Sequence, residues 1–119
     1  MDGAHLEERD LSGAMLYSTS LIGANLRHST LVGGNLSYAG LSISNLEGVD
    51  LRRANLKGAN LRRAKLANAI LDDANLTYAD MTGADMTGVS LQNTKLGNAI
   101  WTDGKRCLPQ SVGKCLVEQ

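Results

Sequence analysis

The residues that could carry covalent or metal chemistry are few and lie at opposite ends of the chain. The 119-residue sequence has two cysteines, Cys107 and Cys115, near its C-terminus, and two histidines, His5 and His28, nearer its N-terminus. Zinc sites need several Cys or His ligands brought close together, so no metal site is expected. Two neighbouring cysteines with none elsewhere favour one disulfide that closes a short loop, with two reduced thiols as the alternative.

Catalytic groupings are equally hard to find. Ser and Thr are plentiful, but His28 is the only histidine away from the N-terminal end, and no pattern of a nucleophile with its base emerges. Many glycines are separated by multiples of five residues. They do not cluster ahead of a predicted helix, as the glycines of phosphate-binding loops do. We therefore expect no enzyme activity, no catalytic residue and no cofactor.

A run of basic residues in the middle of the chain is the remaining candidate site. No acidic residue interrupts it, and its members are Arg52, Arg53, Lys57, Arg62, Arg63 and Lys65. One interpretation is a binding patch for an anionic partner. The other, which we favour, is a solvated belt partly neutralised by Asp72 and Asp73. The whole chain has 12 basic and 12 acidic residues, which argues against a general attraction to nucleic acid or anionic membrane.

Leucine recurs at every fifth position from Leu6 to Leu76, and the series continues through Met81, Met86, Leu91 and Leu96 to Trp101. The residue two places earlier is small, most often Ala. The residue one place earlier is usually Asn or Asp, and Gly is common two places after. A period of five gives no stripe on an α-helix and alternates faces on a long strand. It suits a three-residue side followed by a tight corner, at which Gly supplies a positive φ.

Four such pentads make one square coil of 20 residues, and the repeats from residue 4 to 103 make about five coils. At about 4.8 Å per coil this predicts a rod roughly 24 Å long. Residues 20 apart should lie above one another, so we expect Glu7, Arg27 and Glu47 to form a ladder. Arg52 should stack on Asp72, Arg53 on Asp73, and the column Asn35, Asn55 and Asn75 could exchange amide hydrogen bonds between coils.

The pattern Ala-Asn/Asp-Leu-x-x resembles the pentapeptide-repeat family over residues 4–103. The resemblance implies an all-β fold, a right-handed quadrilateral β-helix solenoid with Leu stacked inside. This chain has Leu or Met where other members often carry Phe. We predict a repeat domain over 1–103 and a C-terminal cap over 104–119, with a short amphipathic helix at 108–117.

The sequence of the cap is similar to the C-terminal caps of some bacterial, cyanobacterial and plastid-lumen members. Together with the cysteine pair, this resemblance favours the periplasm or thylakoid lumen, provided a targeting segment has been removed. The cytoplasm is the alternative, with reduced thiols. No apolar stretch is long enough to cross a bilayer, so no membrane insertion is expected.

The first coil has no comparable cap, and Arg9 occupies a slot that should point inward. Either this coil is distorted, or its open end pairs with another molecule, for example with a second copy in a homodimer. We predict a non-catalytic scaffold that binds another protein. The alternative is DNA mimicry toward a topoisomerase such as DNA gyrase, which some family members practise and which needs a strongly acidic rod. An engineered solenoid is a third reading, against which the irregular outward residues argue.

Overall fold

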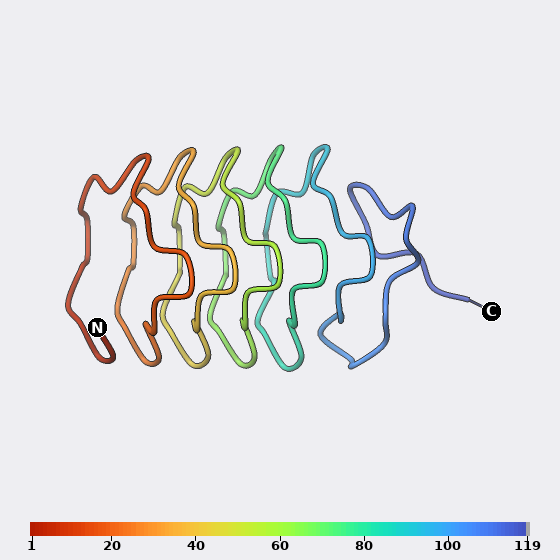
Figure 1. The fold of residues 1–119 in the computed structure, drawn as a ribbon, viewed down its shortest axis with the longest axis horizontal. Helices are drawn as coiled ribbons and strands as arrows, with labels where there is room; N and C mark the ends of the chain where they lie inside the picture. Colours follow the sequence, from red (N-terminus) through yellow and green to blue (C-terminus); the bar gives the residue numbers. More distant parts are fainter. Residues whose placement is uncertain (119) are drawn as a thin grey trace.

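Each coil of the chain takes 20 residues. In the computed structural model, which describes residues 1–118, parallel β-bridges join residues 20 apart, from His5 with Asn25 to Asp80 with Ile100. Figure 1 shows the coils stacked along the long axis, with the two termini at opposite ends. The molecule measures 41 × 25 × 22 Å. The predicted rod length of about 24 Å referred to the repeats alone. The longest extent of 41 Å also includes the cap. The number of coils remains the sequence-based estimate.

Each side of a coil is too short to form a regular strand. It contributes one bridge residue, and residues 1–118 contain no α-helix and therefore no helix that could cross a membrane. Asn55 shows the pattern: its N–H donates to the Gly34 carbonyl at 2.9 Å, and its carbonyl accepts from Leu36 at 2.7 Å. The corner that follows is closed by the Ala59 N–H, which donates to the Leu56 carbonyl at 3.0 Å.

The interior is a stack of leucines. The side chains from Leu21 to Leu76 in the five-residue series are exposed by 1% or less, and Ala fills most of the small inward slots between them. Ser29 and Ser44 occupy two of these slots, and their hydroxyls donate to the carbonyls of Leu26 and Leu41, each at 2.6 Å. Because these buried hydroxyls are paired within their own corner, they cost little compared with an unsatisfied polar group.

The Asn or Asp before each Leu stabilises the corner that follows it. The Oδ1 of Asn75 accepts from the Thr77 N–H at 3.0 Å, and Asp85 accepts in the same way from Thr87. This is an Asx-turn, which explains the preference for short side chains with an acceptor oxygen. Asn35 and Asn55 use their Oδ1 within the coil too. The predicted exchange of amide hydrogen bonds between coils through these Oδ1 atoms is therefore wrong.

From Gly3 to Asn98 the third residue of each corner has a positive φ, as the sequence predicted for Gly, whereas at the last repeat Gly104 and not Asp103 has it. Several larger side chains adopt the same conformation, including Tyr38 at 57°, Ile43 at 52° and Arg63 at 58°. Glycine is therefore favoured at this position but not required by φ alone. A second reason is steric, because the Tyr38 ring lies where a Cβ on Gly58 would be, and His28 lies over Gly48 in the same way.

The cap lacks the helix predicted for residues 108–117. Instead the chain reverses and pairs antiparallel with the last coil, through Ile100 with Arg106 and Lys95 with Val112. The Leu96 N–H donates to the Ser111 carbonyl at 3.0 Å. A helix would satisfy its own backbone groups and leave those of the last coil open, whereas this extended segment pairs with them. The predicted cap ended at Gln119, which lies outside the described residues.

The disulfide between Cys107 and Cys115 closes the cap, with 5.0 Å between the two Cα atoms. Cys107 is 1% exposed and packs against the core. The disulfide holds the two arms of the cap together, and the Leu108 N–H donates to the Leu116 carbonyl at 2.7 Å between them. The predicted division of the chain into a repeat domain and a cap domain stays a prediction.

The first coil is open to solvent. Leu6, Leu11 and Leu16 are only partly buried, unlike the leucines of the next coil, and Arg9 is exposed. No coil precedes them among residues 1–118 to pair with the backbone of His5 and its equivalents. Residues 1–20 contain four acidic residues and one basic residue, so the open end has a negative charge.

Candidate interaction surface

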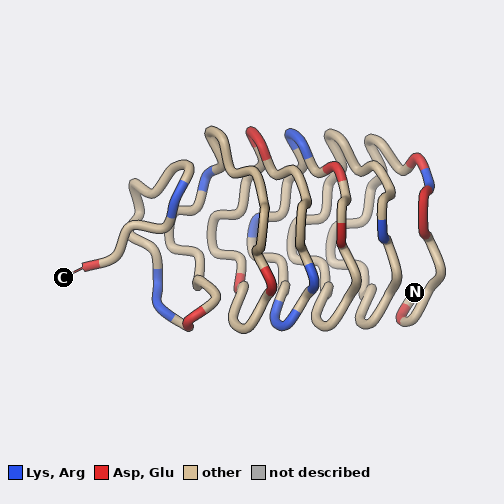
Figure 2. Tube along the Cα trace, turned by 180° about the vertical axis from the view of Figure 1, so that it is seen from behind, with Lys and Arg blue, Asp and Glu red and all other residues tan. Residues whose placement is uncertain are grey.

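The six basic residues proposed as a patch are all exposed, but they do not share one face. Arg52 and Arg53 lie on one corner, Lys57 on the next and Arg62 with Arg63 on the third. Lys65 is a bridge residue on the side that follows. Figure 2 shows positively and negatively charged residues spread over several sides of the rod. A single flat partner therefore cannot contact all six.

Two of the six are held by acids in ion pairs. Arg52 forms a bidentate pair with Asp50 in its own coil, with Nη2 2.7 Å from Oδ2 and Nε 2.9 Å from Oδ1. This hydrogen-bonded pair lowers the pKa of Asp50, against the opposing effect of burial. Arg62 pairs with Asp80 of the next coil at 3.2 Å. In residues 1–118, the structure contains no ion pair that involves Arg53, Lys57, Arg63 or Lys65.

The predicted ladders are only partly present. Arg27 pairs with Glu47 at 3.1 Å, as expected, but Glu7 contacts His5 instead. Asp72 does not pair with Arg52. Its Oδ1 accepts from the Ser90 hydroxyl and from the Gln92 N–H, because the bridge position at Ser90 lacks the usual Asn or Asp. Asp2 caps the corner at Ile22 in the same way. The 20-residue stacking alone could not predict that Asp72 and Asp2 each cap a corner of the next coil.

The exposed large apolar side chains were not singled out by sequence analysis. Within residues 1–103 they are Met1, Met15, Tyr17, Ile22, Tyr38, Ile43 and Tyr78. All three tyrosines of the chain lie on one corner, at exposures of 57–60%. The signal was available in the printed sequence, because Tyr17, Tyr38 and Tyr78 follow the same side of the coil under the 20-residue register.

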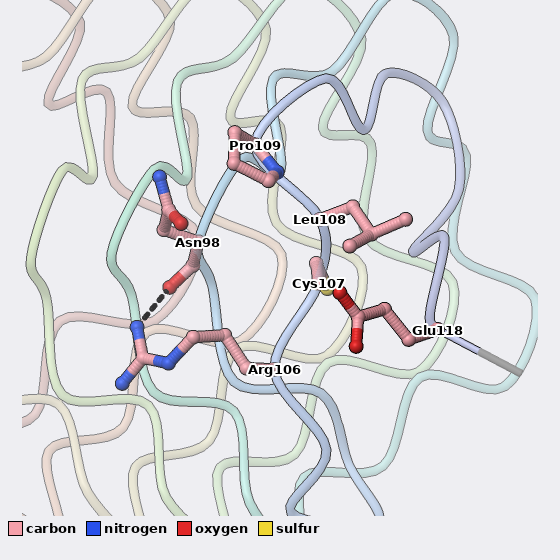
Figure 3. Close-up of a pocket in the computed structure, with 6 residues that line it drawn as sticks. All are labelled: Asn98, Arg106, Cys107, Leu108, Pro109 and Glu118. Carbon is pink, nitrogen blue, oxygen red and sulfur yellow. Dashed lines mark hydrogen bonds between the residues drawn. The ribbon is translucent and has the colours of Figure 1, made fainter.

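A shallow cavity of about 250 Å³ lies between the cap and the last coil. Figure 3 shows its lining, which combines the apolar Leu108 and Pro109 with the charged Arg106 and Glu118. The Arg106 Nη1 donates to the Asn98 carbonyl at 2.7 Å, so the guanidinium is already engaged in holding the cap. Among residues 1–118 no group of three or more His, Cys, Asp or Glu side chains is placed to hold a metal ion.

The sequence profile of pentapeptide repeats matches this chain in eight copies, over residues 1–37, 35–73, 44–82, 54–93 and 71–102. The chain belongs to the pentapeptide-repeat family. Its fold is therefore a right-handed quadrilateral β-helix, as the resemblance implied. Members of this family are generally structural repeat proteins without enzyme activity.

Solved structures of other pentapeptide-repeat proteins resemble this one. A protein of the Arabidopsis thaliana thylakoid lumen has a TM-score of 0.63 and 20% identity, covering 96% of this chain and 81% of its own. A protein from Nostoc has a TM-score of 0.50 and 31% identity, covering 76% of this chain and 68% of its own. One from the cyanobacterium Cyanothece has a TM-score of 0.43 and 28% identity, with 84% and 86% covered. No protein of curated function matches the sequence significantly.

Gly97 has a structural role that the pentapeptide pattern does not reveal. It follows Leu96 directly, where all the other pentads carry a residue with a side chain, and it is buried. Its φ is not positive, but a Cβ there would overlap the carbonyl oxygen of Pro109 in the cap. The residue is therefore selected by the close approach of the cap backbone.

Proposed function

We propose that this protein is a non-catalytic scaffold that binds another protein through its outer surface. The observation that carries the proposal is the filled interior. Leucine and alanine side chains occupy the inside of the rod at 1% exposure or less over its central coils. Close packing of this kind leaves no internal space for a substrate, so recognition must use the outside.

The unpaired cations of the central coils supply the charge for such binding. Lys57 and Arg63 are exposed on adjacent corners and form no ion pair within residues 1–118. Affinity capture from the natural source under native conditions should recover a protein partner with the wild-type chain. Lys57→Glu with Arg63→Glu should lose it, whereas Lys105→Glu with Lys114→Glu in the cap should retain it. Failure to recover any partner with the wild type would argue against the scaffold function.

We propose an oxidising compartment, the periplasm or the thylakoid lumen, as the site of action. The support is the Cys107–Cys115 disulfide, because structural disulfides persist mainly outside the cytosol. Thiol blocking followed by intact-mass measurement, with and without reductant, should show an oxidised pair in protein purified from its source. Two blocked free thiols before reduction would place the protein in the cytoplasm and contradict this location.

Self-association through the open first coil is a second candidate interaction. Its support is the partly exposed end face of Leu6, Leu11 and Leu16. The acidic charge of the same coil opposes contact between two copies, and salt screens such repulsion. Sedimentation velocity should therefore show a dimer that is promoted from 50 mM to 500 mM salt and abolished by Leu11→Glu. A monomer at both salt concentrations would eliminate the homodimer.

DNA mimicry finds no support in the surface of this rod. A mimic of duplex DNA needs a strongly acidic face, whereas the net charge is zero and the central coils carry the six basic residues. We expect a gyrase supercoiling assay to show neither inhibition nor protection by the wild-type chain. Either effect at stoichiometric concentration would reinstate the topoisomerase alternative.

A further inference from the structure

The exposed apolar side chains of the repeats gather on one side of the rod. This side has Ser20, Gly40, Asn60 and Asp80 as its bridge residues. Of the seven exposed large apolar residues within residues 1–103, five lie on the two corners that flank this side, whereas Met1 is in register with the inward Leu21 and Met15 lies on another side. The four sides are equivalent in the backbone, so the fold itself does not require this asymmetry. Contiguous exposed apolar groups on a soluble protein usually mark an interaction site.

The first two coils carry four of these exposed side chains, on the two corners that flank this side. Tyr17 and Tyr38 lie one coil apart on one corner, each 60% exposed. Ile22 and Ile43 lie on the other corner, at 41% and 58%. Between them the bridge residues are the small Ser20 and Gly40, and Ile22 leans over Gly40 at ordinary contact distance. We name Tyr17, Ser20, Ile22, Tyr38, Gly40 and Ile43 the Tyr–Ile surface.

Basic residues continue the same two corners into the next coil. Lys57 follows the tyrosine corner, and Arg62 with Arg63 follows the isoleucine corner. Arg62 is paired with Asp80, but Lys57 and Arg63 have no acidic partner within residues 1–118. An apolar area is thus joined to two cations that are available to carboxylates.

We infer that the Tyr–Ile surface together with Lys57 and Arg63 is the docking site for a polypeptide segment that carries both apolar and acidic side chains. The inference rests on the proposed scaffold function and names the chemistry of its partner. Apolar side chains of the segment cover the tyrosines and isoleucines, whose burial supplies most of the affinity. Its carboxylates pair with Lys57 and Arg63, which fixes the direction of the segment along the rod.

The charges on the same side argue against the two other occupants. Asp2 and Asp103 lie at the two ends of the isoleucine corner, so a flat anionic bilayer that covered the whole side would meet both carboxylates. A second copy docked symmetrically about the middle of this side would place Lys57 and Arg63 near their own equivalents. A short segment that runs from the Tyr–Ile surface to Lys57 and Arg63 meets one carboxylate, that of Asp2 at its first end, and this carboxylate already accepts from the Ser20 hydroxyl and the Ile22 N–H.

Peptide display provides a test that does not need the natural partner. A random library of peptides about twelve residues long is selected on the wild-type chain, and the enriched sequences are synthesised for fluorescence anisotropy. We expect enrichment in Asp or Glu together with Leu, Phe or Trp. The test variant is Tyr38→Ser with Arg63→Ser, which should weaken binding at least 10-fold.

The matched control is His28→Ser with Arg53→Ser. His28 has the same φ of 57° as Tyr38 and likewise lies over a glycine of the next coil, and Arg53 shares the φ of 58° of Arg63. Binding by the control should stay within 2-fold of wild type. Peptides that depend on the control residues instead would refute the Tyr–Ile surface while leaving the scaffold function standing. The absence of any enrichment would count against both.

Two further measurements separate the other occupants. Co-sedimentation with vesicles of phosphatidylcholine and phosphatidylglycerol at 3:1 should show no binding of the wild type. Sedimentation velocity should show no self-association that Tyr38→Ser with Arg63→Ser removes. Vesicle binding lost in that variant would identify a membrane surface, and a dimer lost in it would identify a second copy. Either result would overturn the polypeptide segment.

Discussion

At the third position of a corner the residue adopts a positive φ, and at some corners it also shares space with a side chain that leans toward it from the preceding coil. Tyr38, Arg63 and Asn68 adopt the conformation without being glycine, and each lies over a glycine 20 residues later. A column of glycines therefore does not record φ alone. At Gly48, Gly58 and Gly88 the missing Cβ also leaves room for a side chain of the preceding coil, whereas Ile43 and Arg63 show that successive coils can carry two large side chains.

Gly58→Ala and Gly33→Ala separate these two effects. The two glycines have φ of 67° and 68°, but a Cβ at Gly58 would overlap the Tyr38 ring, whereas nothing lies within 4 Å at Gly33. We expect Gly33→Ala to lower the free energy of unfolding by about 1 kcal/mol. Gly58→Ala should lose about 1 kcal/mol more, because the ring must move.

Urea unfolding of both variants measures the difference. In the Tyr38→Ala background the extra loss at Gly58 should vanish, since the overlapping ring is gone. Equal losses for Gly58→Ala and Gly33→Ala in the wild-type background would show that φ is the only constraint on Gly58.

Asp85 links corner stability to pH. The Thr87 hydroxyl and N–H hydrogen bond to its carboxylate and lower its pKa below the ordinary 3.8. Because the pKa is lower in the folded state, the stabilisation is present above about pH 4. It is lost as the pH falls through the folded pKa. Asn keeps the acceptor oxygen that caps the corner but does not titrate in this range.

We therefore expect Asp85→Asn to leave the melting temperature at pH 7 nearly unchanged and to reduce its fall between pH 4 and pH 2. Asp85→Ala should lower the melting temperature at pH 7 through loss of the cap, and should also flatten the acid dependence. Thermal melts followed by circular dichroism across this pH range test both variants. An unaltered acid dependence in Asp85→Asn would contradict the assignment.

At the scale of elements, the cap is an extended lid joined to the last coil on two of its sides. The Leu96 and Asn98 N–H groups donate to the carbonyls of Ser111 and Cys107, and Trp101 donates to Lys105. Met86 and Leu91, on the other two sides, stay partly exposed, and among residues 1–118 the cap forms no backbone hydrogen bond with them. The attachment of the lid therefore depends on close contact between its backbone and the last coil along these two sides.

Gly97→Ala tests this close approach. Its Cβ would overlap the Pro109 carbonyl oxygen, a backbone atom that moves only with the lid. We expect a loss of about 1–3 kcal/mol, as for other overpacked sites, and faster hydrogen exchange at Asn98. Gly40→Ala is the control, because its φ is also not positive and its Cβ would make only ordinary contacts, the nearest at 3.8 Å. Unchanged exchange at Asn98 in Gly97→Ala would show that the lid is not seated on this residue.

The repeats could be predicted from the sequence because each pentad repeats the same local physics. A small residue, an Asx cap, a Leu and a turn determine one side, and the 20-residue register follows from four of them. The cap could not be predicted in the same way. The apolar spacing of Leu108, Val112 and Leu116 favours a helix locally, but the open backbone of the last coil offers more hydrogen bonds to an extended chain. Such tertiary competition leaves no periodic signal.

The candidate surface shows the same limit. The sequence identified Arg52 and Arg62 as basic. It could not show that Arg52 forms an ion pair with Asp50 and Arg62 with Asp80. The sequence predicted ion-pair partners from the 20-residue register alone. A long side chain can instead reach an acid in the coil above, in the coil below or in its own coil. Arg52 bonds to Asp50, two residues away, in preference to Asp72. Placing the exposed tyrosines on one corner required only the 20-residue register.

At the scale of the whole molecule, every coil shares one apolar column and passes its backbone hydrogen bonds to the next. A rod of this kind behaves as a chain of neighbouring interfaces, so damage in the centre separates two short stacks. Neither stack could bury enough apolar surface to be stable alone. Cooperative unfolding should therefore depend most on the central coils.

Leu56→Asp, in the middle of the rod, should abolish folding or nearly so. Leu56 is 0% exposed, and a carboxylate there would be buried among leucines with no cation to pair with. Protonation relieves the charge but still leaves polar oxygens in an apolar column. Lys57→Ala, at the next residue, removes an exposed side chain and should change the free energy of unfolding by less than about 0.5 kcal/mol. Circular dichroism and urea unfolding compare the two. Wild-type-like melting of Leu56→Asp would mean that the central coil tolerates a break in its column, and that the stacks on either side are stable independently.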